Sequence, residues 1–250
     1  MKLKNKVAIV TGGARDIGRS ISLKLAAEGA KVAVNYFNNE DDGKKTLDLI
    51  ESAGGQAIIV RGDMTKSEDV ERLLGQTQKA FGAQIDTLVN VVGGLVARKT
   101  LNEMDEDFLN FLMRLNLNPV FLTMKAIVPH MPEGSSVINL ASLAGRDGGG
   151  PGASAYAASK GAVMTFTRAM AKELGPKQIR VNALCPGMIS TTFHDTFTKD
   201  EVRGKVAAST PLRREGRPDE VADNVAFLAS NDSSFLTGVN LDVNGGVFFS

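Results

Sequence analysis

The sequence predicts an α/β fold in which helices cover both faces of a doubly wound parallel sheet of about seven strands. Short apolar segments alternate along the chain with longer segments of helical periodicity. A glycine-rich turn directly follows the first apolar segment and opens a helix. The 250 residues contain no linker, repeat or low-complexity tract, so we expect a single domain over residues 1–250.

Seven apolar segments have the composition of buried strands. They are residues 7–10, 32–34, 57–60, 88–92, 137–140, 181–184 and 241–243. Continuously apolar strands separated by helices indicate a parallel sheet that is covered on both faces. Because crossovers between parallel strands are right-handed, such a sheet is doubly wound, which is the Rossmann-type architecture.

Helical patterns fill the intervals between these strands. Ile17, Ile21 and Leu25 recur at the spacing of one helix face. Thr65 and Glu68 have the spacing of a capping box, which predicts a helix start at this point. Beyond the first helix, we expect helices over residues 42–53, 65–81 and 153–174.

The charge balance argues against strongly basic classes of protein. Lys and Arg total 29 against 28 Asp and Glu, so we expect neither a nucleic-acid partner nor a membrane surface. No apolar stretch is expected to span a membrane, and residues 1–6 lack the layout of a signal peptide. The single cysteine, Cys185, fits a reducing compartment, so we expect a cytoplasmic protein. We expect no metal site.

The turn at residues 11–18 has the features of a diphosphate site. Gly12 and Gly18 allow the backbone to approach a ligand closely, and the following helix N-terminus offers free N–H groups and partial positive charge. The plainer interpretation is an ordinary strand-to-helix turn. The position of the turn at the first strand–helix junction favours the binding site.

The end of the second strand indicates which dinucleotide binds. An acid there selects the ribose 2′-hydroxyl of NAD, whereas a nearby arginine accommodates the 2′-phosphate of NADP. Asn35 and Tyr36 are not acidic, and Arg15 lies in the glycine-rich turn, so NADP(H) is favoured over NAD(H). A solvated loop cation is the alternative for Arg15. Asp63, after the third strand, is either an adenine contact or a turn aspartate.

Tyr156 and Lys160 stand one helical turn apart on the same face of a predicted helix. A phenol with a pKa near 10 is a poor base at neutral pH, and an adjacent ammonium favours the phenolate. Ser142 follows the strand at 137–140, at the sheet edge where ligands bind in open α/β folds. Its hydroxyl is placed to bind the substrate oxygen that Tyr156 protonates. A surface tyrosine beside a solvated lysine is the alternative.

A set of motifs in order resembles the short-chain dehydrogenase/reductase family over essentially the whole chain, in particular its 3-oxoacyl-acyl-carrier-protein reductase-like members. The motifs are the T-G-x-x-x-G-x-G turn at 11–18, the D-x-L-V-N-N-A-G strand at 86–93, the helix asparagine Asn116, Ser142 with Y-x-x-x-K at 156–160, the P-G-x-I-x-T segment at 186–191, and the C-terminal Gly238 and Asn244-Gly245-Gly246. Each motif alone is weak to moderate, whereas their order and spacing together are highly specific.

The resemblance implies hydride transfer between a nicotinamide dinucleotide and a carbonyl or alcohol. It makes Tyr156 the general acid in reduction and Ser142 the group that orients the carbonyl. Lys160 binds the nicotinamide ribose and lowers the pKa of Tyr156, and Asn116 holds a water in a proton relay that ends at Lys160. The expected cofactor contacts are Gly12, Arg15, Asp16, Ile17, Gly18, Asn35, Tyr36, Asp63, Met64, Asn90, Val91, Gly93, Tyr156, Lys160, Pro186, Gly187, Ile189 and Thr191.

Two positions depart from the family pattern. Asp16 replaces the middle glycine of the turn, and its carboxylate is unfavourable near a diphosphate unless it points away, caps the helix or pairs with an arginine. Val91 and Val92 replace Asn-Ala after Asn90, which removes a polar side chain from the central strand.

We expect NADPH-dependent reduction of a ketone to a secondary alcohol, with a 3-oxoacyl thioester or a keto sugar acid as candidate substrate. The alternatives are an NAD-dependent sugar or alcohol dehydrogenase and, from another class, a non-catalytic dinucleotide sensor. Arg98, Lys99 and Arg146 are candidates for recognising an anionic substrate.

Family members usually form tetramers, so we expect a homotetramer. The apolar residues 247–249 are expected to be buried, with another subunit as a candidate for the covering surface. Phe193, His194 and Phe197 are candidates for a mobile lid over the site.

Overall fold

The computed structural model describes residues 1–197 and 200–250. Within these residues, seven strands form one sheet in the order β3-β2-β1-β4-β5-β6-β7, and every neighbouring pair is parallel. The strands are β1 (Val7–Thr11), β2 (Lys31–Tyr36), β3 (Gln56–Arg61), β4 (Thr87–Asn90), β5 (Ser136–Leu140), β6 (Arg180–Pro186) and β7 (Asn240–Val243). The predicted fold class and its strands are confirmed.

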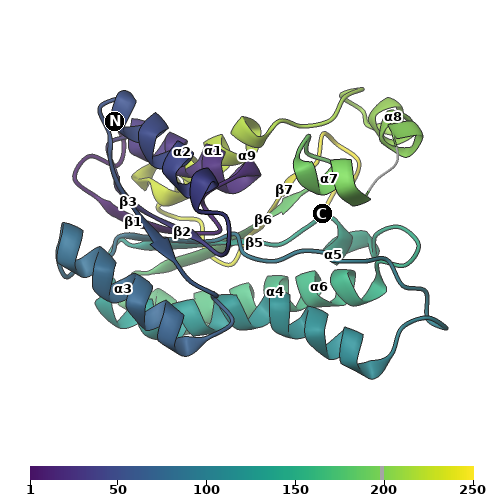
Figure 1. Cartoon of the computed structure of the whole chain (residues 1–250), viewed down its shortest axis with the longest axis horizontal. Helices are drawn as coiled ribbons and strands as arrows, with labels where there is room; N and C mark the ends of the chain where they lie inside the picture. The colour runs from purple at the N-terminus through teal and green to yellow at the C-terminus, as the bar shows by residue number, and fades with distance from the viewer. Residues whose placement is uncertain (198–199) are drawn as a thin grey trace.

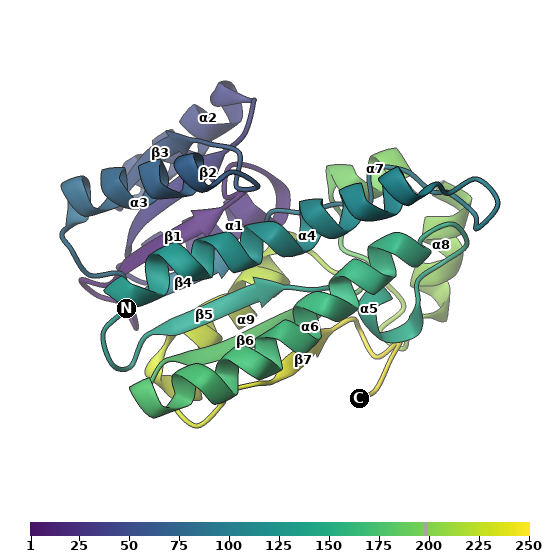
Figure 2. The same cartoon turned by 90° about the horizontal axis from the view of Figure 1, so that it is seen from below.

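Helices cover both faces of this sheet (Figures 1 and 2). One face carries α1 (Asp16–Ala27), α2 (Glu40–Ser52) and α9 (Pro218–Ala229), and the other carries α3 (Ser67–Phe81), α4 (Glu106–Ile127) and α6 (Ser154–Leu174). Short helices lie near the carboxyl ends of the strands: α5 (Ala144–Asp147), α7 (Thr192–Phe197) and α8 (Asp200–Ser209). The 3₁₀ turns are η1 (Val128–His130), η2 (Gly175–Lys177) and η3 (Asn231–Ser233).

Alternation along the strands divides the core into two layers. In β1, Ile9 packs into the layer under α3, α4 and α6, whereas Ala8 and Val10 pack into the layer under α1 and α9. Successive side chains of a strand point to opposite faces, so a strand buried on both faces is apolar at most positions. The order of the strands reverses between β1 and β4, and ligands of open α/β sheets bind at this point.

The start of α3 differs from the prediction. The helix begins at Ser67, and its N-cap residue, Lys66, makes no side-chain cap. Thr65 instead donates its hydroxyl and its backbone N–H to one oxygen of Asp63, at 2.7 and 2.9 Å. The capping box of Thr65 and Glu68 is therefore wrong, because the helix starts at Ser67 and the Thr65 N–H, which Glu68 would accept in that motif, donates to Asp63 instead.

The segment Glu106–His130, which comprises α4 and η1, is long and apolar enough to cross a membrane by length and composition. The expectation that no stretch reaches that length is therefore wrong. In the folded chain α4 packs between α6 and α3 and carries the fully buried Asn116. These contacts are those of a core helix, which passes the same test of length and composition.

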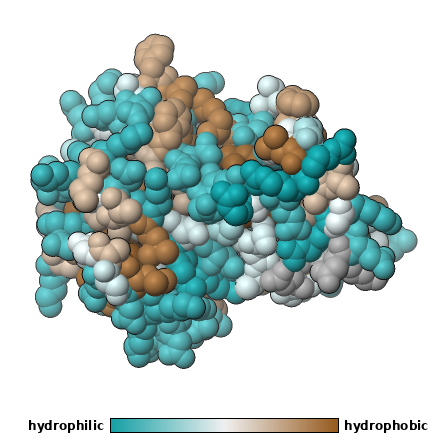
Figure 3. Space-filling model, turned by 90° about the horizontal axis from the view of Figure 1, so that it is seen from above, coloured by the Kyte–Doolittle hydropathy of each residue, from teal (hydrophilic) through white to brown (hydrophobic). Residues whose placement is uncertain are grey.

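Large apolar side chains remain exposed at several places on the described surface, including α4 and the C-terminus. Phe111 and Phe121 on α4 are about half exposed, and at the C-terminus Val247 is 42% and Phe249 is 83% exposed. Val247 and Phe249 are therefore not buried within their own chain, whereas Phe248 is partly buried, and cover by another subunit stays a prediction. By contrast, the face over α1, α2 and α9 is largely hydrophilic, with separate apolar groups (Figure 3).

Candidate active site

A cleft of about 970 Å³ opens at the carboxyl ends of the strands. It contains the predicted site residues Gly12, Arg15, Asp16, Ile17, Gly18, Asn35, Tyr36, Asp63, Met64, Val91, Gly93, Ser142, Tyr156, Lys160, Pro186, Gly187, Ile189 and Thr191. These residues come from seven separate segments that the sheet edge brings together. Of the predicted set, only Asn90 and Asn116 do not line the cleft.

Asn90 lies in a buried polar network on the face of the sheet that α4 and α6 cover. Its amide nitrogen donates to Asn139 at 2.9 Å, and its amide oxygen accepts from the Thr123 hydroxyl at 2.8 Å. Asn139 in turn donates to Thr167 at 3.0 Å. The side chain of Asn90 therefore joins β4 and β5 to α4 and α6, and the structure gives it no place in the cleft.

The glycine-rich turn forms a close-packed cradle at the start of α1. A Cβ atom at Gly18 would lie 2.0 Å from the carbonyl oxygen of Gly12, so only glycine fits there. The side chain of Asn35 accepts from the Gly12 N–H at 3.0 Å and donates to the carbonyl of Gly62 at 3.0 Å, which fixes the turn to β2 and β3. The N-cap residue Arg15 provides no side-chain cap for α1. The turn therefore fits a diphosphate, which the first N–H groups of the helix would bind.

No acidic side chain stands at the end of β2, although Asp42 and Asp63 also line the cleft. Tyr36 and the exposed Phe37 end β2, and no carboxylate stands at this point of the strand. Asp42, which also lines the cleft, pairs with the Arg19 guanidinium at 2.8 Å. The Arg15 side chain lies in the cleft and is 67% exposed, so a phosphate there would meet an accessible cation.

Asp63 has the geometry of a turn residue, because one of its oxygens binds Thr65. It also lines the cleft, as does Met64, whose side chain is fully buried. Both interpretations of Asp63 are thus compatible with its position.

The catalytic candidates meet at the chemical end of the cleft. Tyr156 and Lys160 lie on one face of α6, and the Lys160 Nζ is 5.9 Å from the centre of the Tyr156 ring. Tyr156 makes a side-chain hydrogen bond with Ser142, which follows β5. Burial raises the pKa of the Tyr156 phenol above its usual value, and the bond with Ser142 opposes part of that rise.

Lys160 is the most constrained charged group of this site. Its side chain is 4% exposed, and its Nζ donates to the carbonyl of Leu140 at 2.7 Å. Burial lowers the pKa of the Lys160 ammonium to about 8. The carbonyl of Leu140, at the end of β5, therefore holds a cation one helical turn from the phenol of Tyr156.

Asn116 supports the cleft from behind. It accepts from the Gly94 N–H at 2.9 Å and donates to the Gly94 carbonyl at 3.1 Å. Its amide nitrogen also donates to the Leu112 carbonyl one turn earlier in α4, at 3.0 Å. Asn116 thereby fixes the loop after β4, and the backbone of that loop lines the cleft in its place.

Several apolar residues of the cleft were missed in the sequence. Leu143, Met188 and Val206 lie around its chemical end, together with Phe111 and Leu115 from α4. Phe111 and Leu115 are four residues apart in α4, so this spacing of one helix face would have been the signal for both. The other three lie in loops or in the short helix α8, where no periodicity marks them.

The three cations considered for substrate recognition have different surroundings. Arg146 pairs with Asp242 at 3.2 Å and donates to the Asn240 carbonyl at 2.5 Å, so it anchors α5 to β7. Lys99 lies 3.7 Å from Asp105. Arg98 lines the cleft.

The side chains of the lid candidates Phe193 and His194 lie outside the described residues, whereas Phe197 lines the cleft.

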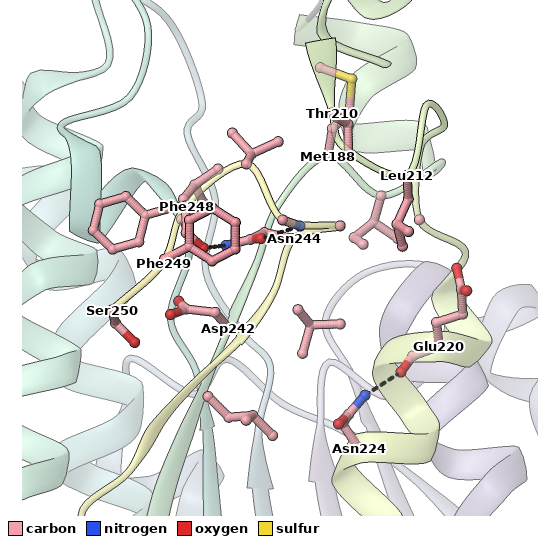
Figure 4. A pocket seen from close by; sticks show the side chains of 18 of the residues that line it. Met188, Thr210, Leu212, Glu220, Asn224, Asp242, Asn244, Phe248, Phe249 and Ser250 are labelled. Atoms are coloured by element: carbon pink, nitrogen blue, oxygen red, sulfur yellow. Dashed lines mark hydrogen bonds between the residues drawn. The ribbon is translucent and has the colours of Figure 1, made fainter. Parts of the chain in front are cut away.

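A second cavity of about 620 Å³ lies beside the cleft (Figure 4). Phe248 and Phe249 lie on one side of it, Met188 and Leu212 on another, and Glu220 of α9 at its far end. Leu143, Met188, Ile189 and Val206 line both spaces.

We predict that Lys160→Met abolishes turnover but stabilises the fold. Methionine has a similar length and no charge to bury, while the lost bond to Leu140 offsets part of the gain. We expect the free energy of unfolding at pH 7 to rise by about 2 kcal/mol, measured by urea denaturation. A less stable variant would contradict the assignment of a costly buried charge.

The pH dependence of this difference provides a control. The pKa of Lys160 is about 8 in the folded chain against 10.5 for an exposed lysine, so the unfolded chain binds more protons between these values. Stability of the wild type therefore rises with pH across this window through Lys160. The advantage of Lys160→Met should shrink from pH 8 to 10.5, and a constant difference would contradict the shift.

Comparison with known proteins agrees with this geometry. Residues 12–248 match the family profile described as Enoyl-(Acyl carrier protein) reductase. The 3-oxoacyl-acyl-carrier-protein reductase FabG of Staphylococcus epidermidis is 34% identical over 246 residues, which are 98% of this chain and 99% of that protein. A short-chain dehydrogenase/reductase from Serratia marcescens superposes with a TM-score of 0.92 at 31% identity, covering 98% of this chain and 99% of the other.

A third similar structure is a blue fluorescent protein from a metagenomic library in complex with NADPH, with a TM-score of 0.91 and 33% identity over 98% of this chain and 99% of the other. The parallel sheet, the glycine-rich turn and the Ser-Tyr-Lys arrangement occur here in one chain with full-length similarity to such proteins. The chain therefore belongs to the short-chain dehydrogenase/reductase family and is an oxidoreductase.

Proposed function

We propose that this oxidoreductase reduces a ketone to a secondary alcohol with NADPH, and that Tyr156 is the general acid. The observation that carries the proposal is the meeting of Ser142, Tyr156 and Lys160 in the same cleft as the glycine-rich turn. One cleft then holds both a dinucleotide site and a proton donor.

Each of the three side chains has a defined task in this proposal. The dinucleotide supplies the hydride. The hydroxyls of Ser142 and Tyr156, which are hydrogen-bonded to each other, bind the carbonyl oxygen together. The raised pKa of Tyr156 keeps the phenol protonated at neutral pH, which suits proton donation to the developing alkoxide. The Lys160 ammonium stabilises the phenolate that remains.

The preference for NADPH rests on charge at the adenosine end. Arg15 offers an exposed guanidinium, and the end of β2 carries no acid that would bind a ribose 2′-hydroxyl and repel a phosphate. The similar metagenomic protein is in complex with NADPH. An NAD-dependent sugar or alcohol dehydrogenase lacks such support, because it calls for an acid at Asn35 or Tyr36.

The chemical end of the cleft favours a ketone with an apolar substituent. Its walls include Leu95, Phe111, Leu143, Met188 and Val206, which do not supply the hydrogen bonds that a keto sugar acid needs. Of the two candidate substrates, a 3-oxoacyl thioester therefore fits better. Arg98 is the candidate cation for a polar end of such a substrate.

Tyr156→Phe is the direct test of the enzyme hypothesis. Removing the phenol hydroxyl should lower kcat for reduction of a 3-oxoacyl thioester by about 10³-fold, because a positioned general acid contributes about 10²–10⁴-fold. NADPH should still bind, as measured by its fluorescence. Turnover retained by the variant would contradict the role of Tyr156, and a wild type that binds NADPH without turning over any ketone would indicate the sensor.

Arg15→Ala tests the cofactor preference. Loss of charge-assisted hydrogen bonds to a 2′-phosphate should raise KM for NADPH by about 10–100-fold. KM for NADH, which lacks that phosphate, should change by less than about 3-fold and serves as the internal control. An equal effect on both cofactors, or a wild type that prefers NADH, would overturn the proposed preference.

We propose that the chain works as a cytoplasmic homotetramer. The exposed Phe111 and Phe121 on α4 and the exposed Val247 and Phe249 support an assembly that covers them. Light scattering should give about 106 kDa, four times the 26.5 kDa of the chain. A compact monomer of 26.5 kDa would contradict this proposal.

A further inference from the structure

Asp16 adopts a backbone conformation that normally favours glycine. Its φ is +48°, in the left-handed region, at the position where the family has the middle glycine of its turn. Aspartate tolerates this region better than most residues, but the conformation still costs free energy. A residue held there calls for a compensating contact.

The carboxylate of Asp16 makes that contact with Thr192, which lies 176 residues further along the chain. One oxygen accepts from the Thr192 backbone N–H at 3.1 Å, and the other accepts from the Thr192 hydroxyl at 2.6 Å. Arg15 completes the cluster, with its Nε 3.9 Å from Asp16 and an Nη 3.5 Å from the Thr192 hydroxyl. The Asp16 carboxylate is therefore held by two hydrogen bonds from Thr192 and by an ion pair with Arg15.

This contact joins the two sides of the cofactor cleft. Asp16 lies at the start of α1, beside the backbone that would bind a diphosphate. Thr192 is the first residue of α7 and follows Thr191, another residue of the cleft. The link between them therefore connects two segments that line the cleft, next to the turn that fits a diphosphate.

We propose that Asp16 is a positioning residue that fastens α7 to the glycine-rich turn and thereby slows release of the dinucleotide. The inference rests on the proposed function only in requiring that a nicotinamide dinucleotide binds in this cleft. A diphosphate leaves through the gap that the Asp16–Thr192 link closes, so the link must open before release. The hydrogen bonds from Thr192 also explain how a carboxylate is tolerated beside a diphosphate site.

The rate of dinucleotide release tests this role directly. NADPH, and separately NADH, is displaced from the full-length enzyme and followed by stopped-flow fluorescence for four proteins: wild type, Asp16→Gly, Thr192→Val and the double variant. Glycine adopts the left-handed conformation without strain, so Asp16→Gly folds while losing both bonds. We expect it to accelerate release about 10-fold and Thr192→Val about 3-fold, in line with the loss of charge-assisted bonds.

The double variant distinguishes a link from two separate effects. It should release NADPH no faster than Asp16→Gly, because both substitutions break the same contact. Thr100→Val is the matched control, since Glu103 accepts from the Thr100 N–H and hydroxyl at 2.8 and 2.6 Å at a site away from the cleft. That variant should release NADPH at the wild-type rate.

Three results would overturn the inference. The first is an unchanged release rate in Asp16→Gly. The second is a double variant in which the effects of Asp16→Gly and Thr192→Val on the release rate multiply. The third is faster release in Asp16→Gly only together with a lowered thermal unfolding midpoint, which indicates general loosening of the fold. If neither NADPH nor NADH binds the wild type, the proposed function fails as well. Dinucleotide binding with unchanged release rates overturns this inference alone.

Discussion

The burial of the Lys160 ammonium is the constraint on which the site depends. A cation without solvent is costly, and this one donates a hydrogen bond to the carbonyl of Leu140 at the end of β5. The carbonyl is available there because Leu140 is where the strand leaves the sheet. Tyr156 shares the helix face with Lys160, so the same packing that holds the cation also places the phenol. The fold thus keeps a costly buried positive charge beside the phenol of Tyr156.

Other side chains in and around the cleft support this arrangement from a distance. Asn116 fixes the loop after β4 through Gly94, and Asn35 fixes the glycine-rich turn through Gly12. The ion pair of Arg146 with Asp242 ties α5, which follows Ser142, to β7. None of these three contacts involves the substrate. Each holds a backbone segment whose position at the sheet edge decides where a dinucleotide and a carbonyl meet.

Features that depend on a local pattern of residues could be predicted from the sequence. Buried parallel strands are apolar at most positions, so the sheet was predictable, and a spacing of four residues placed Tyr156 beside Lys160. The side-chain direction of Asn90 was missed. Side chains two residues apart in a strand point to the same face, and Leu88 packs under α3, α4 and α6, so Asn90 points to that face as well. The partner of Asp16 could not be found from the sequence, because Thr192 is 176 residues away and no local pattern links them.

The central claim is that buried Lys160 sets the pKa of Tyr156 when the dinucleotide is bound. The chain has two tyrosines and no tryptophan, so a Tyr36→Phe background leaves Tyr156 as the only phenol for ultraviolet titration. We predict a pKa above the usual value of about 10 for the free protein and a pKa well below it with saturating NADP⁺. In Tyr36→Phe/Lys160→Met the decrease on NADP⁺ binding should be largely lost. An equal decrease with and without Lys160 would contradict the account.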